Sequence, residues 1–257
     1  MEKQMISIVC TCNNRTILDN YLMEGLDKQS IDYELIVIED KKSDFNSAAE
    51  ALNYGGKKAV GDYIIFAHQD VKMDTPYWLR DMETLVEKIP NLGIAGIAGK
   101  SEDNNEVVTN VKHGNNPHFA GKQIKEPIQV QTLDECLLIV PKDVFDRLKF
   151  DEVTCDGWHL YGVDYCLMVK DLGLDVYVLP LPITHKSSGD PFAKEYYRIL
   201  GRLFKKHGKN YKIIHTTVSN WNTRYSVGIE KQRFWLTNKI YSGAKNRVTL
   251  IMNRLGI

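Results

Sequence analysis

Short hydrophobic runs alternate with amphipathic segments over the first part of the chain. The runs at residues 5–10, 34–38 and 63–67 are rich in β-branched and other apolar side chains, which is typical of strands buried on both faces. Residues 16–26 and 47–59 carry apolar side chains at helical spacing between these runs. Strands and helices that alternate in this way predict an α/β fold, in which helices flank a mostly parallel central sheet.

The pattern changes near residue 190. Before this point the predicted sheet is extended by further short apolar runs, at residues 93–98, 136–140 and 176–179. Beyond it strand patterns are scarce, and residues 192–207 and 234–255 are basic and aromatic with helical spacing. We therefore expect two units, a sheet-containing domain at residues 1–190 and a basic, mainly helical appendage at residues 191–257.

The composition is that of an ordinary globular protein. The chain has 257 residues, of which 43% are hydrophobic and 26% charged, enough for one substantial core. Its five cysteines are an odd number and lie mostly in apolar runs, which favours reduced, packed thiols over a disulfide framework. No apolar stretch is long enough to span a bilayer, and no secretory signal is evident. We therefore expect a cytoplasmic protein.

The net charge is zero but unevenly distributed. Residues 194–257 contain fourteen Lys and Arg against two acids, a net charge of +12, so the rest of the chain carries −12. A basic segment on an acidic body fits an anionic partner, either lipid headgroups or nucleic acid, and it fits a solvated helical face equally well. Because the sequence has no RNA- or DNA-binding motif, we expect no nucleic-acid partner.

Polar residues follow several of the predicted strands. Such strand ends gather at one edge of a parallel sheet, where α/β proteins bind their ligands. The clusters are residues 11–15, Glu39 with Asp40, residues 68–70, and His185 with its neighbours. The sequence has no GxGxxG after the first strand, which weakens a dinucleotide hypothesis, and no GxxxxGK[ST], which excludes a P-loop protein.

The cluster at residues 68–70 is the most informative. His68 and Asp70 directly follow a buried strand and lie two residues apart, so both side chains point into the same crevice. An imidazole beside a carboxylate suits a divalent cation, and such a cation neutralises phosphates. The alternative is a polar loop at a strand end that binds no ligand.

Four segments, in this order, resemble the family 2 glycosyltransferases and their GT-A nucleotide-sugar-binding fold. They are residues 7–15, 36–40, 51–55 and 59–70. The resemblance covers roughly residues 5–190. It is greatest to the branch in which the usual Asp-x-Asp motif is replaced by His-Gln-Asp, here residues 68–70.

The resemblance implies a nucleotide site and a metal site. It places the nucleotide against Thr11, Cys12, Asn14, Arg15, Asn53 and His68, with Asp40 on the base. Asp70 and His185 match positions that bind Mn²⁺ or Mg²⁺ in the family. The alternative for His185 is a structural histidine in a loop.

The resemblance also implies a catalytic base, Asp164, at the start of a helix that faces the acceptor. The family often has a second acid beside this position and an arginine downstream. Here Val163 stands in place of that acid and the arginine is absent, so Asp156 and His159 are alternative bases, and an N-cap is the structural alternative for Asp164. Trp158, His159 and Tyr161 are candidate acceptor contacts, with ordinary core packing as the alternative for the two aromatics.

The function implied is that of a metal-dependent inverting glycosyltransferase. Such an enzyme moves a sugar from a UDP- or dTDP-sugar to a hydroxyl of a glycan or a lipid-linked acceptor, in surface polysaccharide or glycoconjugate synthesis. A non-catalytic nucleotide-sugar or glycan-binding module on the same scaffold is the alternative.

Residues 231–257 contain six Lys and Arg and no acid, interleaved with aromatic and aliphatic side chains. This pattern fits a helix that lies on an anionic membrane. We therefore expect peripheral contact at the inner face of the membrane. Docking on the catalytic domain, or on a second subunit in a homodimer, would produce the same pattern.

Overall fold

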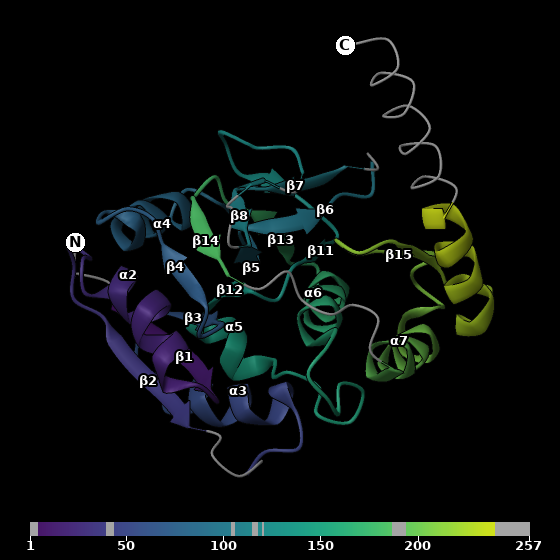
Figure 1. The fold of residues 1–257 in the computed structure, drawn as a ribbon, viewed down its shortest axis with the longest axis horizontal. Coiled ribbons are helices and arrows are strands. Elements are labelled where there is room, and N and C mark those ends of the chain that lie inside the picture. Colours follow the sequence, from purple (N-terminus) through teal and green to yellow (C-terminus); the bar gives the residue numbers. More distant parts are fainter. Residues whose placement is uncertain are drawn as a thin grey trace, which may run out of the picture.

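A seven-stranded sheet forms the centre of the computed structural model, which describes residues 5–39, 44–103, 106–114, 118–119, 121–186 and 194–239 (Figure 1). From one edge to the other, the strands are β10 (Ile128–Gln129), β13 (Asp175–Val178), β5 (Leu92–Gly96), β12 (Leu137–Pro141), β3 (Tyr63–Ala67), β1 (Ile6–Cys12) and β2 (Glu34–Glu39). The three N-terminal strands lie within two residues of their predicted positions.

Most of this sheet is parallel, as predicted. β1 pairs in parallel with β2 and β3, and β13 pairs in parallel with β5. β12 runs antiparallel between β3 and β5, and β10 runs antiparallel to β13 at the edge. Five of the seven strands therefore run in one direction, and the carboxyl ends of β1 and β3 meet at the same edge.

Helices cover both faces of the sheet and enclose two hydrophobic cores. One core lies under α1 (Arg15–Leu18), the π-helical segment η1 (Asp19–Met23), α2 (Glu24–Leu26) and α4 (Trp78–Val86). The other lies under α3 (Ala48–Gly56), α5 (Lys142–Arg147), α6 (Tyr161–Asp171) and α7 (Lys194–His207). Adjacent strand residues alternate between the two, so that Ile8 belongs to the first core and Val9 to the second.

Two small sheets and a hairpin complete the described fold. The four-stranded sheet contains β4 (Val71–Met73), β14 (Ile183–His185), β8 (Val111–His113) and β9 (His118–Phe119). The three-stranded sheet contains β11 (Thr132–Leu133), β6 (Ala98–Lys100) and β7 (Val107–Thr109), and the hairpin contains β15 (Ile213–His215) and β16 (Asn220–Asn222). The pairing of β14 with β4 places His185 directly opposite Val71.

Part of the predicted appendage is built into the main core. Tyr196, Leu200 and Leu203 of α7 and Trp221 of the hairpin are buried in the same cluster as α6, and α7 lies beside α6 in Figure 1. The expected boundary at residue 190 lies outside the described residues. The prediction of a helix at 234–255 is described only as far as residue 239, where residues 227–239 are helical.

Acids of the sheet-containing domain pair with the cations of α7. Arg202 lies 2.7 Å from Asp156, which also pairs with Arg198. Lys206 lies 2.7 Å from Asp151. Part of the charge asymmetry is thus compensated within the chain.

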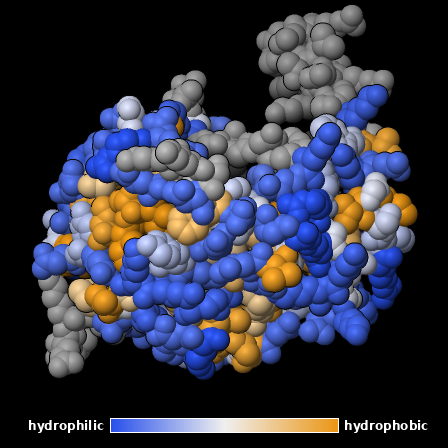
Figure 2. All heavy atoms as spheres, turned by 90° about the horizontal axis from the view of Figure 1, so that it is seen from below, coloured by the Kyte–Doolittle hydropathy of each residue, from blue (hydrophilic) through white to orange (hydrophobic). Residues whose placement is uncertain are grey.

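The molecular face in Figure 2 is mainly hydrophilic, with hydrophobic patches among the charged side chains. Within the described ranges, every helix is too short or too polar to cross a membrane.

We predict that residues 1–193 alone do not fold cooperatively. Ending the chain there removes seven apolar or aromatic side chains that are buried in the core, Tyr196, Tyr197, Ile199, Leu200, Leu203, Ile214 and Trp221. Each contributes about 1.5–3 kcal/mol on burial, and their sum approaches the whole stability of an ordinary domain. Urea unfolding followed by circular dichroism should give a broad, shallow transition, whereas residues 1–239 should unfold sharply. A sharp transition with the same midpoint for both would contradict this.

Candidate metal and nucleotide site

A crevice of about 620 Å³ lies at the carboxyl ends of β1 and β3. Its walls come from five parts of the chain. These are the end of β1 with the following loop and α1, the segment that leads into α3 with the first part of α3, the end of β3 with the loop that follows, the connection between β11 and β12, and the region around the start of α6. The lining residues are Thr11, Cys12, Asn13, Ile17, Phe45, Asn46, Ala48, Leu52, Phe66, Ala67, His68, Gln69, Asp70, Glu135, Trp158 and Tyr161. The volume is that of a typical small-molecule site.

His68, Asp70 and His185 form a compact group at the inner end of this crevice. One candidate ligand atom from each lies within 4.8 Å of the others. β3 ends at Ala67 and β4 begins at Val71, so His68 and Asp70 occupy the short connection between them. Because β14 pairs with β4, His185 Nε2 lies 3.2 Å from Asp70 Oδ1. Strand pairing therefore brings together residues that are more than a hundred positions apart in the sequence.

The electrostatics of this group suit a metal ion. Both ring nitrogens of His185 are buried and lack a hydrogen bond of good geometry among the described residues, although Nε2 lies 3.2 Å from Asp70 Oδ1. A cation shared by the two side chains would satisfy them. Burial, and then the neighbouring His185, lower the pKa of His68 to about 4, so its imidazole is neutral, the form that binds metals. Two imidazoles and a carboxylate are a ligand set that could hold a divalent metal ion.

Two further residues, which the sequence analysis did not single out, lie close to the histidines. Burial acts to raise the pKa of Asp134, but His185 and the N–H of Cys136 outweigh it and hold that pKa below its ordinary value. Asp134 therefore keeps a negative charge close to His185 and His68. His113 lies opposite His185 in the paired strands, with the ring centres 5.5 Å apart.

Gln69 ties the metal end of the crevice to the first loop. Its Oε1 accepts hydrogen bonds from the N–H groups of Asn13 at 3.2 Å and Asn14 at 3.0 Å, and its Nε2 donates to Asn13 Oδ1 at 2.6 Å. The Asn14 side chain in turn caps α1 by accepting from the N–H of Ile17. The middle residue of the His-Gln-Asp segment thus fixes the loop that follows β1.

The structure brings some of the predicted nucleotide residues into the crevice and places others elsewhere. Thr11, Cys12 and His68 line it, and the Asn14 side chain caps α1. Arg15 is exposed and pairs with Asp19 at 2.9 Å. Asp40 lies outside the described residues.

Asn53 has a different environment from the one predicted. It is buried, donates to the carbonyl of Phe150 at 2.9 Å and accepts from its N–H at 3.0 Å. These bonds tie α3 to the segment before α6, and Asn53 is not among the residues that line the crevice.

Two lining residues near the start of α3 were missed, Phe45 and Asn46. Asn46 precedes Ser47, the N-cap of α3. A lone aromatic residue in a polar stretch just before an N-cap was the signal available in the sequence.

Two of the candidate acceptor residues, Trp158 and Tyr161, line the crevice near the start of α6. Trp158 is 40% exposed, and Tyr161 donates or accepts a 3.0 Å hydrogen bond with His68 Nε2. His159 packs against Tyr196, with ring centres 6.0 Å apart. Asp156 is paired with two arginines of α7. Trp158 and Tyr161 can therefore contact a ligand in the crevice, whereas the carboxylate of Asp156 is ion-paired with arginines of α7.

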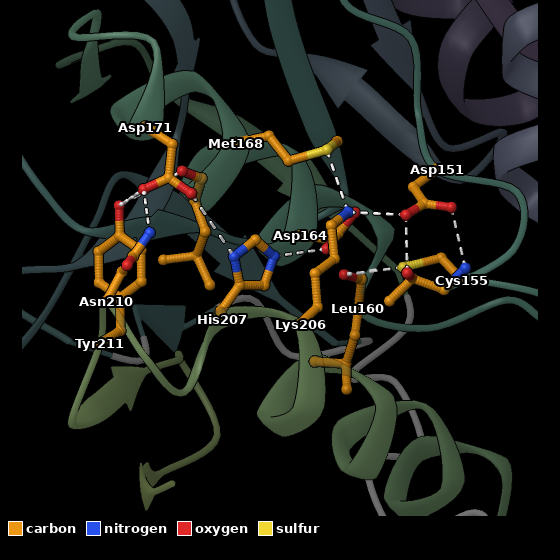
Figure 3. A network of polar contacts seen from close by, with 12 residues as sticks. Asp151, Cys155, Leu160, Asp164, Met168, Asp171, Lys206, His207, Asn210 and Tyr211 are labelled. Carbon is orange, nitrogen blue, oxygen red and sulfur yellow. Dashed lines mark hydrogen bonds and ion pairs between the residues drawn. The ribbon is translucent and has the colours of Figure 1, made fainter.

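Asp164 lies in the interface between α6 and α7 rather than among the residues that line the crevice (Figure 3). Its side chain is fully buried. It accepts from Lys206 Nζ at 2.8 Å and lies 2.7 Å from His207 Nε2. Because two cationic or hydrogen-bonding partners from α7 occupy both carboxylate oxygens, this geometry favours a structural role for Asp164.

Glu135 is a further lining residue that the sequence analysis did not select. Its Oε1 accepts a 2.9 Å hydrogen bond from the N–H of Gly162 in the first turn of α6. Burial raises the pKa of Glu135 to about 8. The only signal in the sequence was a pair of acids, residues 134 and 135, directly before a predicted strand.

A profile described as "Glycosyltransferase like family" matches residues 7–217. The match begins in β1 and ends just after β15. The chain therefore belongs to this glycosyltransferase-like family, as the resemblance in its sequence predicted.

A curated relative from Fuscovulum blasticum, described as "ATP synthase subunits region ORF 6", is 29% identical over 173 residues. That alignment covers 62% of this chain and 65% of the relative. This chain thus spans slightly less than two thirds of that protein.

Solved structures share the fold at low identity. S. aureus TarS 1–349 in complex with UDP-GlcNAc has a TM-score of 0.57 and 15% identity, over 79% of this chain and 66% of that one. The mannosyltransferase PcManGT from Pyrobaculum calidifontis, in complex with GDP-Man and Mn²⁺, has a TM-score of 0.55 and 13% identity, over 81% of this chain and 65% of that one. The predicted GT-A fold is confirmed.

We predict that Asp164→Asn destabilises the protein without weakening nucleotide binding. Removing one member of a buried ionic group costs on the order of 3 kcal/mol, because His207 and Lys206 lose their shared carboxylate. Urea unfolding gives the change in the free energy of unfolding, and calorimetry gives the affinity for UDP with Mn²⁺. The matched control is Asp143→Asn, whose exposed surface pair with Arg147 contributes less than about 1 kcal/mol. Unchanged stability in Asp164→Asn would contradict the structural role.

Proposed function

We propose that this chain is a metal-dependent inverting glycosyltransferase that moves a sugar from a nucleoside diphosphate to an acceptor hydroxyl. The observation that carries this proposal is the group of His68, Asp70 and His185 at the inner end of a crevice of nucleotide size. Membership of the glycosyltransferase-like family supports it.

His68, Asp70 and His185 would hold the cation. Imidazole ligands suit Mn²⁺ better than Mg²⁺, which prefers oxygen ligands in octahedral geometry, so we propose Mn²⁺. A cation bound there supplies Lewis-acid stabilisation of the diphosphate as it leaves. The negative charge of Asp134 behind the histidines stabilises the charged site.

The donor nucleotide is proposed to lie along the outer part of the crevice. Ile17, Phe45 and Leu52 offer apolar contacts to a base and ribose, and Thr11 and Asn46 offer polar ones. The Gln69 contacts hold the loop after β1 in place, which lowers the entropy cost of binding. We propose a UDP- or dTDP-sugar, with GDP-sugars as the competing class that the experiment below includes.

The acceptor would approach past Trp158 and Tyr161, which offer aromatic surface for a sugar ring. Attack from the side opposite the leaving diphosphate inverts the anomeric carbon, by the same geometry as in inverting glycosidases. We propose a glycan or lipid-linked acceptor, in the synthesis of a surface polysaccharide or glycoconjugate.

A non-catalytic nucleotide-sugar-binding module is the second candidate function. Val163 in place of an acid and the burial of Asp164 favour it, because the residue matched to the base does not line the crevice. Hydrolysis of UDP-, dTDP- and GDP-sugars with and without Mn²⁺ distinguishes the two. A transferase should release nucleoside diphosphate slowly to water in the presence of Mn²⁺, whereas a module would bind a nucleotide and release none.

We predict that UDP stabilises the protein only when Mn²⁺ is present, and that Asp70→Asn removes the effect. A ligand at a hundred times its dissociation constant contributes about 2.7 kcal/mol, which corresponds to roughly 5–10 °C for a chain of this size. Thermal unfolding with UDP, Mn²⁺, both and neither measures it. Asp81→Asn, on the exposed surface of α4, is the matched control and should behave as wild type. An equal shift in Asp70→Asn would contradict the metal assignment.

We also propose that the C-terminal segment from residue 231 makes peripheral contact with anionic membranes. Its described part, up to residue 239, packs inward through Phe234, whose ring centre lies 5.5 Å from that of Trp221. Trp235 and Leu236 are 48% and 61% exposed and share one surface with Lys231 and Lys239. Such a face fits an anionic interface.

Flotation with vesicles of phosphatidylglycerol and phosphatidylcholine tests this, and we predict that the full chain floats while residues 1–230 do not. If the full chain stays in the soluble fraction, membrane contact is refuted. Sedimentation velocity of the same two proteins then shows whether the segment instead joins two subunits.

A further inference from the structure

The pairing of β12 with β3 places Glu135 close to the candidate metal group in the crevice. It lies between β11 and β12, and β12 pairs with β3 so that Leu137 is opposite Ala67, the last residue of β3. The N–H of His68 donates to the carbonyl of Cys136 at 2.9 Å. The backbone at Glu135 is therefore held next to the start of the His-Gln-Asp segment.

Two of the described residues that line the crevice are acids, Asp70 and Glu135. Asp70 lies 3.2 Å from His185 and belongs to the candidate metal group. The acid matched to the family's base, Asp164, is occupied by Lys206 and His207. Glu135 is thus the lining carboxylate that remains for proton transfer.

The first turn of α6 packs closely against the Glu135 side chain. The N–H of Gly162 donates to Oε1 at 2.9 Å. A Cβ at Gly162 would lie 2.9 Å from Glu135 Cγ, too close without a shift of the glutamate. Glu135 therefore occupies the space next to Gly162 in the first turn of α6, and a larger residue at position 162 would displace it.

We propose that Glu135 is the general base of the transfer reaction, an assignment that rests on the glycosyltransferase function proposed above. Glu135 takes the proton of the acceptor hydroxyl as that oxygen forms its bond to the anomeric carbon. The bond from this carbon to the diphosphate oxygen breaks, and its electron pair leaves with the nucleoside diphosphate. Proton transfer by a positioned carboxylate accounts for factors of about 10² to 10⁴ in rate.

The surroundings of Glu135 strengthen it as a proton acceptor. Burial and the nearby Asp134 raise its pKa, while the N–H groups of Leu160, Tyr161 and Gly162 act in the opposite direction. A carboxylate with a pKa of about 8 is a stronger base than an ordinary one, and the ionised fraction that can accept a proton grows as the pH rises through 8. The other titratable groups that face it are Tyr161, Cys155, Cys166 and Tyr196, and burial raises the pKa of each of them.

The test is to compare donor turnover and UDP binding in Glu135→Gln, Glu135→Asp and the wild type. The donor is the nucleotide sugar that the wild type hydrolyses or transfers fastest with Mn²⁺. Glu135→Gln keeps the size of the side chain and should lose at least 100-fold in turnover, and Glu135→Asp should lose less. Affinity for UDP with Mn²⁺, measured by calorimetry, should stay within about threefold in both. Glu87→Gln, on the exposed end of α4, is the matched control and should equal the wild type.

Two results would overturn the assignment. One is wild-type turnover in Glu135→Gln. The other is a loss of turnover in folded Asp164→Asn that equals or exceeds the loss in Glu135→Gln. A wild type that neither binds UDP with Mn²⁺ nor turns over any donor would refute the proposed transferase itself, and thus differs from a failure of Glu135 alone. Thermal unfolding shows that each variant is folded, and a Glu135 variant that binds UDP as the wild type does is folded at the site.

Discussion

The pairing of β14 with β4 is the interaction on which the site depends. β4 begins directly after Asp70, and β14 ends at His185, so their antiparallel register leaves Asp70 and His185 3.2 Å apart. With His68 these two residues form a group whose candidate ligand atoms lie within 4.8 Å of one another, and the buried ring nitrogens of His185 suit a cation. Gln69, between His68 and Asp70, accepts hydrogen bonds from the loop after β1 and so fixes that loop relative to the group. One short strand pair thus positions both the candidate metal site and the loop expected to hold a nucleotide.

The C-terminal part of the chain contributes to the fold in a way that its charge does not suggest. Its excess of positive charge pointed to an external anionic partner, yet Arg202 and Lys206 of α7 pair with acids of the sheet-containing domain. Trp221 and several residues of α7 complete the core beside α6. Thr217 also donates to Asp134, so this segment supports the environment of the candidate metal group. The region from 194 to 222 is therefore part of the same folded unit.

The pattern of buried strands that end in polar residues was sufficient to predict the sheet and the convergence of polar clusters, among them residues 68–70 and His185, at one edge of it. The roles of Asp70 and His185 as metal ligands, and of His68 as a nucleotide contact, came from the family resemblance and stay predictions. The roles of Asn53 and Asp164 depend on partners far away in sequence, such as Phe150 and Lys206, and side-chain direction on a helix cannot be read from a motif match alone. Glu135 was missed for the same reason: its place in the crevice follows from the register of β12 against β3.

Whether His68, Asp70 and His185 share one cation can be measured by pulsed electron paramagnetic resonance of Mn²⁺ bound with UDP. We expect couplings from two imidazole nitrogens, one of which disappears in His185→Ala while the other remains. A spectrum with no imidazole coupling, or one that is unchanged in His185→Ala, would show that these residues do not share a cation.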